Sequence, residues 1–222
     1  MHTDHYNLGG DYVPDPSGDA TAIIDAFFDH VAATVREHDL DTGLVAEMHS
    51  RLEESVAANR HRIIDEPAAH NLRMTLALVV AYRMLSPHLG RTATIAALRR
   101  AFVEPLGASV RAGTRAMLDA APDPFAAMVA VSKARERYAF GDGFTFVRPA
   151  DDNRAYHVDV TRCFYHEVLV AHSAPELTPV MCEFDANWIE AIDPAKHGFS
   201  FERPTTIGRG GSHCPFHFDR TP

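Results

Sequence analysis

The three cysteines of this 222-residue chain lie in its final third, where other residue types able to do chemistry are also concentrated. They are Cys163, Cys182 and Cys214. Cys214 ends the run Gly-Gly-Ser-His-Cys at 210–214, and a glycine-rich turn can bring backbone N–H groups near a reacting centre. A cysteine in such a setting acts as a nucleophilic thiolate or as a metal ligand. We therefore expect the functional site in this part of the chain.

Three segments combine several short motifs. The first reads Arg-Cys-Phe-Tyr-His-Glu at 162–167. The second holds Pro-Glu-Leu at 175–177 and Cys-x-x-Asp at 182–185, and the third holds Arg-x-x-Thr at 203–206 before the run that ends at Cys214. In this order and spacing the segments resemble the L-2-amino-thiazoline-4-carboxylic acid hydrolase family over residues 140–220.

The resemblance implies an enzyme that opens the ring of a 2-amino-thiazoline carboxylic acid and gives an N-carbamoyl cysteine. In that ring an electrophilic, amidine-like carbon lies between nitrogen and sulfur. Hydrolysis needs a nucleophile, a proton donor for the departing ring atom, and a cation for the substrate carboxylate.

Cys214 is the first choice as the nucleophile. Its thiolate would be favoured by an imidazolium, which His213 or His217 could supply. Side chains 213 and 217 share one face of a strand while 214 points to the other, so His166 on a neighbouring segment is an equally good partner. Cys163 belongs to the same catalytic set.

Arg162 and Arg203 are the expected anchors for the substrate carboxylate, because arginine binds carboxylates bidentately. Asp185 is either catalytic or pairs with an arginine to hold the sheet to its helices. Thr206 and Cys182 are expected near the substrate, although Cys182 equally fits a small core hydrophobe.

One part of the ending differs from the family pattern, in which the cysteine is followed by Asp-Phe-Arg. Here the residues are Pro215, Phe216 and His217. An acid and a base are lost and a histidine is gained, so a related heterocycle is also compatible as the substrate.

Two other classes of function fit the same residues. A zinc site could use the pairs Cys163-x-x-His166 and Cys214-x-x-His217 together with Cys182, whereas the thiol enzyme would need no cofactor. A non-catalytic protein could instead enclose a small apolar ligand between aromatic strands.

Hydrophobic periodicity predicts an α+β fold, in which a helical N-terminal region packs against a small C-terminal antiparallel sheet with two helices. We expect a loose arm over 1–18, a helical region over 19–140 and an α+β region over 141–222 that carries the site. The first three expected helices begin near Asp19, near Asp41 and at Pro67. Further helices are expected over 92–103, 109–120, 125–138, 168–170 and 175–192. The expected strands cover 144–148, 156–161, 199–202 and 216–219.

The histidines of the helical region are expected to be surface or capping groups. They are His30, His38, His49, His61, His70 and His88.

Composition narrows the partners to a small-molecule substrate. The net charge of -9 argues against nucleic acid. The longest apolar run is far shorter than the ~20 residues of a membrane helix, and the first residues do not predict a signal peptide. An odd number of cysteines then favours a reducing cytoplasm. The sequence is also compatible with a homo-oligomer.

Overall fold

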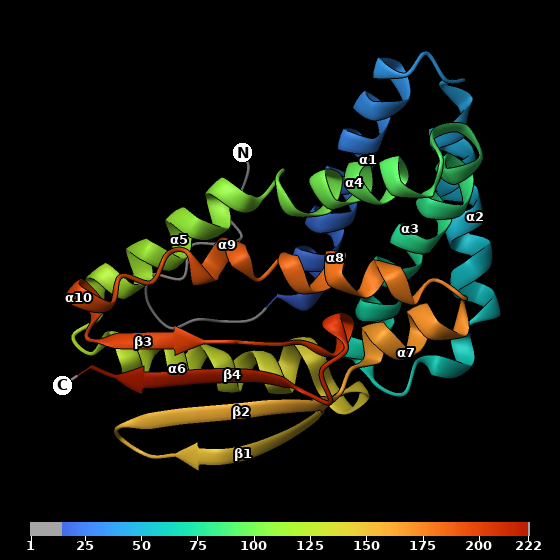
Figure 1. Cartoon of the computed structure of the whole chain (residues 1–222). Helices are drawn as coiled ribbons and strands as arrows, with labels where there is room; N and C mark the ends of the chain where they lie inside the picture. Colours follow the sequence, from blue (N-terminus) through green and yellow to red (C-terminus); the bar gives the residue numbers. More distant parts are fainter. Residues whose placement is uncertain (1–14, 222) are drawn as a thin grey trace.

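A computed structural model describes residues 15–221 and contains a helical region followed by a four-stranded antiparallel sheet. This arrangement confirms the predicted α+β fold. Figure 1 shows helices both above and behind the strands of the sheet. Residues 1–14 of the expected arm lie outside the described residues. The first helix begins at Pro16, three residues before the expected start at Asp19.

The helical region contains six α-helices. They are α1 (Pro16–Glu37), α2 (Gly43–Ala58), α3 (Glu66–Leu89), α4 (Arg91–Val103), α5 (Gly107–Ala120) and α6 (Pro124–Arg135). Three of them begin with an aspartate whose carboxylate accepts a backbone N–H, followed by a proline in the first helical positions. These aspartates are Asp15, Asp65 and Asp123. Helix α3 is buried on nearly all sides, which explains its continuous apolar sequence.

The sheet has the order β1-β2-β4-β3 and is antiparallel throughout. Its strands are β1 (Thr145–Asp151), β2 (Ala155–Arg162), β3 (Phe199–Glu202) and β4 (Cys214–Arg220). Strands β1 and β2 form a hairpin, and β4 pairs with both β2 and β3 although it comes last in the chain. Alternation along β2 and β4 gives the sheet an inner face and an outer face.

Short helices connect β2 to β3. They are α7 (Phe164–Ala171), α8 (Thr178–Glu183), α9 (Ala186–Ile189) and α10 (Pro194–His197). The single helix expected over 175–192 is therefore wrong: it divides into a short 3-10 turn, α8 and α9. The guanidinium of Arg203 donates a 3.0 Å hydrogen bond to the carbonyl oxygen of Cys182. In a continuous helix this carbonyl would instead accept the backbone N–H four residues later.

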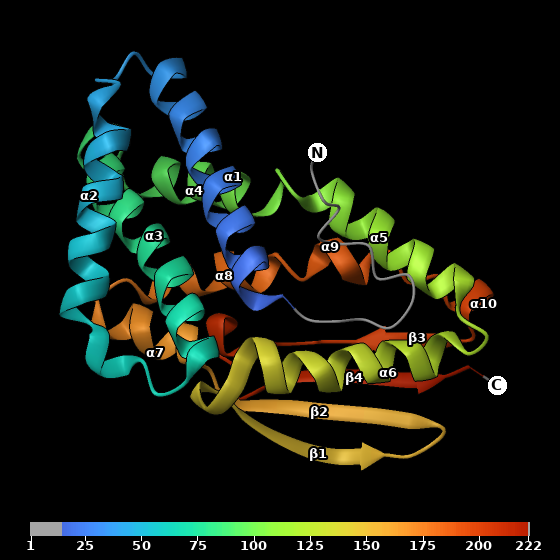
Figure 2. The same ribbon diagram turned by 180° about the vertical axis from the view of Figure 1, so that it is seen from behind.

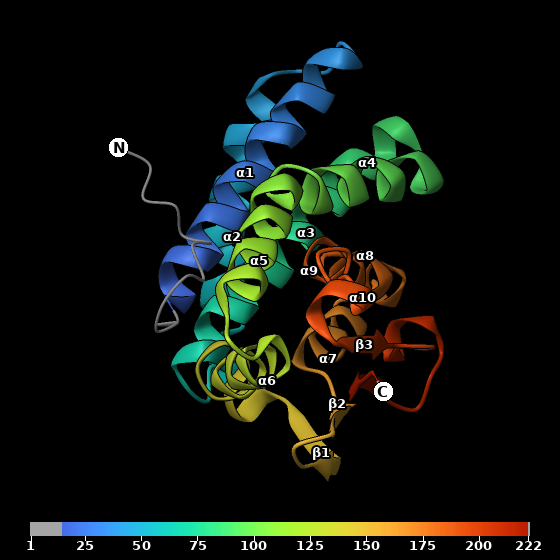
Figure 3. The same ribbon diagram turned by 90° about the vertical axis from the view of Figure 1, so that its left-hand side faces the viewer.

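The inner face of the sheet packs on helices from both regions. One buried cluster joins Tyr156, Val158, Phe199 and Phe218 to residues of α5 and α6. Figure 2 shows α6 lying along the sheet, and Figure 3 shows the strands end-on beside α6 and below α10. A second cluster extends from α1 and α3 to Cys214 on β4, so the core continues across both regions. No helix among residues 15–221 is long and apolar enough to cross a membrane.

Candidate active site

A cavity of about 210 Å³ lies between the inner face of the sheet and the helices. Five of the residues singled out in the sequence line it. They are Cys163, Cys182, Asp185, Arg203 and Cys214. They come from the start of α7, from α8, from the break between α8 and α9, from the segment after β3 and from the first residue of β4. The fold thus brings residues far apart in the sequence to one place.

Cys214 is buried, with 7% of its surface exposed, and points to the inner face of β4. The backbone N–H of Ile207 donates a 3.1 Å hydrogen bond to its Sγ. Burial raises the pKa of the Cys214 thiol to about 11, while the Ile207 N–H and the positive charge of Arg203 oppose this rise. The thiol is therefore protonated at neutral pH and needs a proton acceptor when it reacts.

Cys163 lies at the N-cap of α7, and the backbone N–H groups of His166 and Tyr165 favour its thiolate. Burial outweighs them and raises the pKa of the Cys163 thiol to about 12. Burial also raises the pKa of Cys182, and the nearby hydroxyl of Thr206 opposes the rise. The Cys182 and Cys214 thiols also contribute to the raised pKa of Cys163, and all three thiols line the one cavity.

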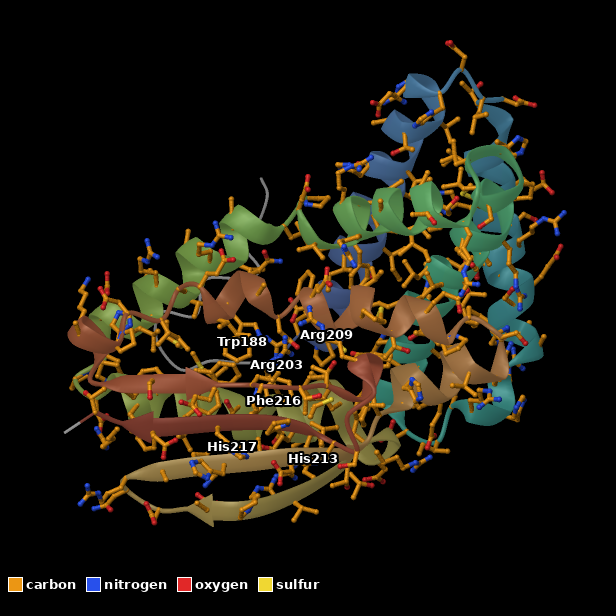
Figure 4. The ribbon with its side chains drawn as sticks, viewed as in Figure 1. Trp188, Arg203, Arg209, His213, Phe216 and His217 are labelled. Atoms are coloured by element: carbon orange, nitrogen blue, oxygen red, sulfur yellow. The ribbon has the colours of Figure 1, made fainter. Side chains whose placement is uncertain are left out.

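Arg203 is held from several sides. Its Nη1 donates to Oδ2 of Asp185 at 2.5 Å, its Nη2 donates to the carbonyl of Cys182, and its guanidinium lies 5.1 Å from the ring of Phe216. The other oxygen of Asp185 accepts the indole N–H of Trp188 at 3.0 Å. Figure 4 shows Trp188, Arg203 and Phe216 gathered between α9 and the strands β3 and β4. The hydrogen bonds of Arg203 to Asp185 and to the Cys182 carbonyl use two of its five guanidinium N–H donors. The guanidinium can therefore also bind a substrate carboxylate.

His213 and His217 do not line this cavity, because they lie on the outer face of the sheet. Nε2 of His217 is 2.9 Å from Oδ1 of Asp159, and Nε2 of His213 is 3.9 Å from the same oxygen. The ring of His217 also stacks on His157 at 4.2 Å. The expectation that either histidine activates Cys214 is therefore corrected: adjacent residues of a strand point to opposite faces.

Three other expected site residues lie at the edge of the cavity or away from it. The guanidinium of Arg162 is exposed and forms a bidentate pair with Glu167, so it is not the carboxylate anchor in this structure. Nδ1 of His166 lies 3.0 Å from Oγ1 of Thr178, and Thr178 does line the cavity. Thr206 is buried and lies beside Cys182.

The five residues considered as zinc ligands do not converge. His217 is on the outer face of the sheet, whereas the three cysteines face the cavity. Among residues 15–221, no three histidine, cysteine, aspartate or glutamate side chains form an arrangement that could hold a metal ion. The zinc site that the Cys-x-x-His spacing predicts is therefore not formed by these residues in this structure.

The cavity also contains polar residues that sequence reasoning missed. The Tyr165 hydroxyl donates a 2.9 Å hydrogen bond to Oδ1 of Asn71, whose amide nitrogen donates to the carbonyl of Ala139. Nε2 of His70 is buried and has no hydrogen-bond partner within the described part of the chain. The sequence signal is a His-Asn pair near the start of α3. The expectation that His70 is a surface or capping group is wrong, because this residue lines the cavity and its Nε2 is buried.

Comparisons with known proteins place the chain in a family. The sequence model of the L-2-amino-thiazoline-4-carboxylic acid hydrolase family matches residues 70–218, which is more than half of the chain. The match begins at His70 in α3 and ends at Phe218 in β4, so it includes the three cysteines and all of the cavity lining except the residues of α1. No curated protein and no solved structure gave a match. The chain belongs to the L-2-amino-thiazoline-4-carboxylic acid hydrolase family.

Proposed function

We propose that this protein hydrolyses a small cyclic C=N compound, a 2-thiazoline-4-carboxylate or a related heterocycle, by cysteine thiol chemistry. The observation that carries the proposal is the meeting of three thiols with the Asp185 carboxylate and the Arg203 guanidinium in a single cavity. The volume of about 210 Å³ is below the ~300–1,000 Å³ of drug-sized sites, which favours a small substrate.

Cys214 is the proposed nucleophile. It faces the cavity from the first residue of β4, and both the Ile207 N–H and Arg203 favour its thiolate. Arg203 binds the carboxylate on C4 of the ring, which places C2 at the sulfur. Asp185, which lines the same cavity, carries the thiol proton to the ring nitrogen as the sulfur adds to C2.

The reaction then continues in two steps, ring opening and hydrolysis of the bond to the enzyme. The bond from C2 to the ring sulfur breaks, and this sulfur takes up a proton and becomes the thiol of a cysteine. Water attacks the C2 carbon bound to Cys214, the enzyme thiol leaves with a proton, and the oxygen of water becomes a carbonyl. For the 2-amino substrate the product is N-carbamoyl cysteine, and one water is consumed.

A direct assay tests the proposal. The purified protein would be incubated with L-2-amino-thiazoline-4-carboxylate, and the free thiol released would be measured together with the mass gain of one water. Cys214→Ser should abolish turnover while the protein remains folded. A Cys214→Ser variant with full activity would overturn the role of this thiol.

The non-catalytic alternative has one observation in its favour, the apolar lining of the cavity. A ligand-binding protein would bind the heterocycle without releasing a thiol, and Cys214→Ala would leave that binding unchanged. The three cysteines are free, and we propose a reducing cytoplasm as the place of action on this ground.

A further inference from the structure

Among residues 15–221, His70 is the one histidine that lines the cavity. It lies in α3 one helical turn before Met74, which lines the same cavity. Its Nε2 is buried and has no hydrogen-bond partner in the described part of the chain. A buried ring nitrogen without a partner costs free energy, and a bound ligand can supply the missing hydrogen bond. This position therefore points to contact with a substrate.

The contacts of α3 place His70 at the end of the cavity that holds Cys163. The neighbouring residue, Asn71, accepts a 2.9 Å hydrogen bond from the Tyr165 hydroxyl through its Oδ1. Tyr165 lies in the first turn of α7, two residues after Cys163, and all four residues line the cavity. The packing of α3 on α7 thus joins the histidine to the part of the cavity where the thiols lie.

The position of Arg203 indicates which edge of the substrate ring faces this end. Arg203 lies beside Phe216, two residues further along β4 than Cys214. The direction from Arg203 to Cys214 continues past Val160, which is opposite Cys214, towards Cys163 at the end of β2. In a thiazoline with its carboxylate on Arg203, the ring nitrogen is bonded to C4 and stays near this anchor. The bond from C2 to the ring sulfur is the far edge of the ring, and it faces the Cys163 end.

The two proton transfers therefore fall on opposite sides of the ring. Asp185, which is hydrogen-bonded to Arg203, lies on the side of the ring nitrogen, and both of its oxygens already accept hydrogen bonds. The departing sulfur on the other side needs a proton donor of its own. Cys163 is a poor donor, because burial raises the pKa of its thiol to about 12. Histidine is the residue type that exchanges protons most readily near neutral pH.

We propose that His70 is a catalytic residue that gives a proton to the departing ring sulfur and then takes one from the attacking water. This inference rests on the proposed function. The imidazolium gives its Nε2 proton as the bond from C2 to sulfur breaks and the bonding electrons move to sulfur. The neutral imidazole takes a proton from water as the water oxygen bonds to C2, and the second water proton leaves with the sulfur of Cys214. One water is consumed, and the imidazolium is restored.

The test compares 2-amino-thiazoline-4-carboxylate with the matching oxazoline, in which oxygen replaces the ring sulfur. An alcohol is a far weaker acid than a thiol, so a departing oxygen depends more strongly on a proton donor. His70→Gln should lower kcat/KM about tenfold for the thiazoline and about a thousandfold for the oxazoline. His88→Gln changes an exposed histidine of the same helix and should alter neither value. Both reactions are followed by the mass gain of one water.

The outcomes separate the two proposals. If the wild type opens neither ring, the proposed function fails. If it opens only the thiazoline, or if His70→Gln lowers both values equally or not at all, the proposed function stands and His70 is not the proton donor. If His70→Gln does not fold, a structure of Cys214→Ser with the thiazoline bound decides. Hydrogen-bond contact between Nε2 of His70 and the ring sulfur supports the inference, and the lack of this contact contradicts it.

Discussion

The backbone N–H of Ile207 donates a 3.1 Å hydrogen bond to the Sγ of Cys214 across the loop that joins β3 to β4. Ile207 begins a short 3-10 turn, and Gly210 ends it with φ of 86°, a conformation that favours glycine. The glycine-rich stretch therefore folds the chain back so that a backbone donor meets the thiol. This contact favours the thiolate in a cavity that otherwise disfavours charge.

Replacement of Cys214 by serine should lower kcat by roughly 10³-fold or more, because the covalent step is lost. Cys182→Ser changes a thiol in the same cavity and serves as the matched control, with an expected loss of less than about tenfold. The measurement is thiol release at saturating substrate, with circular dichroism to verify folding. Equal losses in the two variants would indicate that the cavity, and not the nucleophile, had been damaged.

Removal of the Arg203 guanidinium should mainly weaken recognition of the carboxylate. Arg203→Met should raise KM for the 4-carboxylate far more than for the same heterocycle without the carboxylate. The variant should also lose about 1–3 kcal/mol of stability, because Asp185 and the Cys182 carbonyl lose their partner. Kinetics with both substrates and urea unfolding provide the two readouts. An equal effect on both substrates would mean that Arg203 only supports the fold.

The raised thiol pKa values predict how stability depends on pH. Folding raises the pKa of Cys214 to about 11 and that of Cys163 to about 12, above the ~8.5 of an unfolded cysteine. The unfolded chain therefore loses these protons first. The stabilisation is fully present below about pH 8.5 and is lost as the pH rises towards the folded-state values.

Urea unfolding between pH 7 and 10.5 measures this loss. Wild type should lose stability more steeply above pH 8.5 than Cys163→Ala, which has one titrating thiol fewer. Parallel curves for the two proteins would show that folding does not shift the pKa of Cys163.

The outer-face histidines should be dispensable for turnover. His217→Gln removes a ring that pairs with Asp159 on the side of the sheet away from the cavity. We expect a change in kcat/KM below about threefold, since the variant alters no group that faces the substrate. His213→Gln should behave in the same way. A large loss of kcat in either variant would return an outer-face imidazole to the mechanism.

Hydrolysis should not depend on added metal. The cysteines and His217 lie on opposite faces of the sheet, and the proposed steps use only thiol, carboxylate, guanidinium and imidazole groups. Activity after dialysis against a chelator should equal the initial activity within error, and elemental analysis should find less than one zinc per chain. Loss of activity that zinc restores would contradict this mechanism.

The sequence by itself determined the helical region, the antiparallel strands and the family, because these depend on local periodicity and on motifs within short segments. Pro67 predicted where α3 begins, and alternation predicted that His213 and His217 point away from Cys214. It also suggested that Asp185 pairs with an arginine, and the structure identifies that arginine as Arg203.

Only the tertiary structure decided which of these residues meet. Pairing of β4 with β2 places Cys214 opposite Val160, close to Cys163, although more than fifty residues separate the two cysteines in the sequence. The packing of α3 against α7 brings Asn71 to Tyr165. His70, which the helical pattern predicts at the surface, lines the cavity instead. Such contacts arise from the burial of apolar faces across the whole chain, and local spacing carries no information about them.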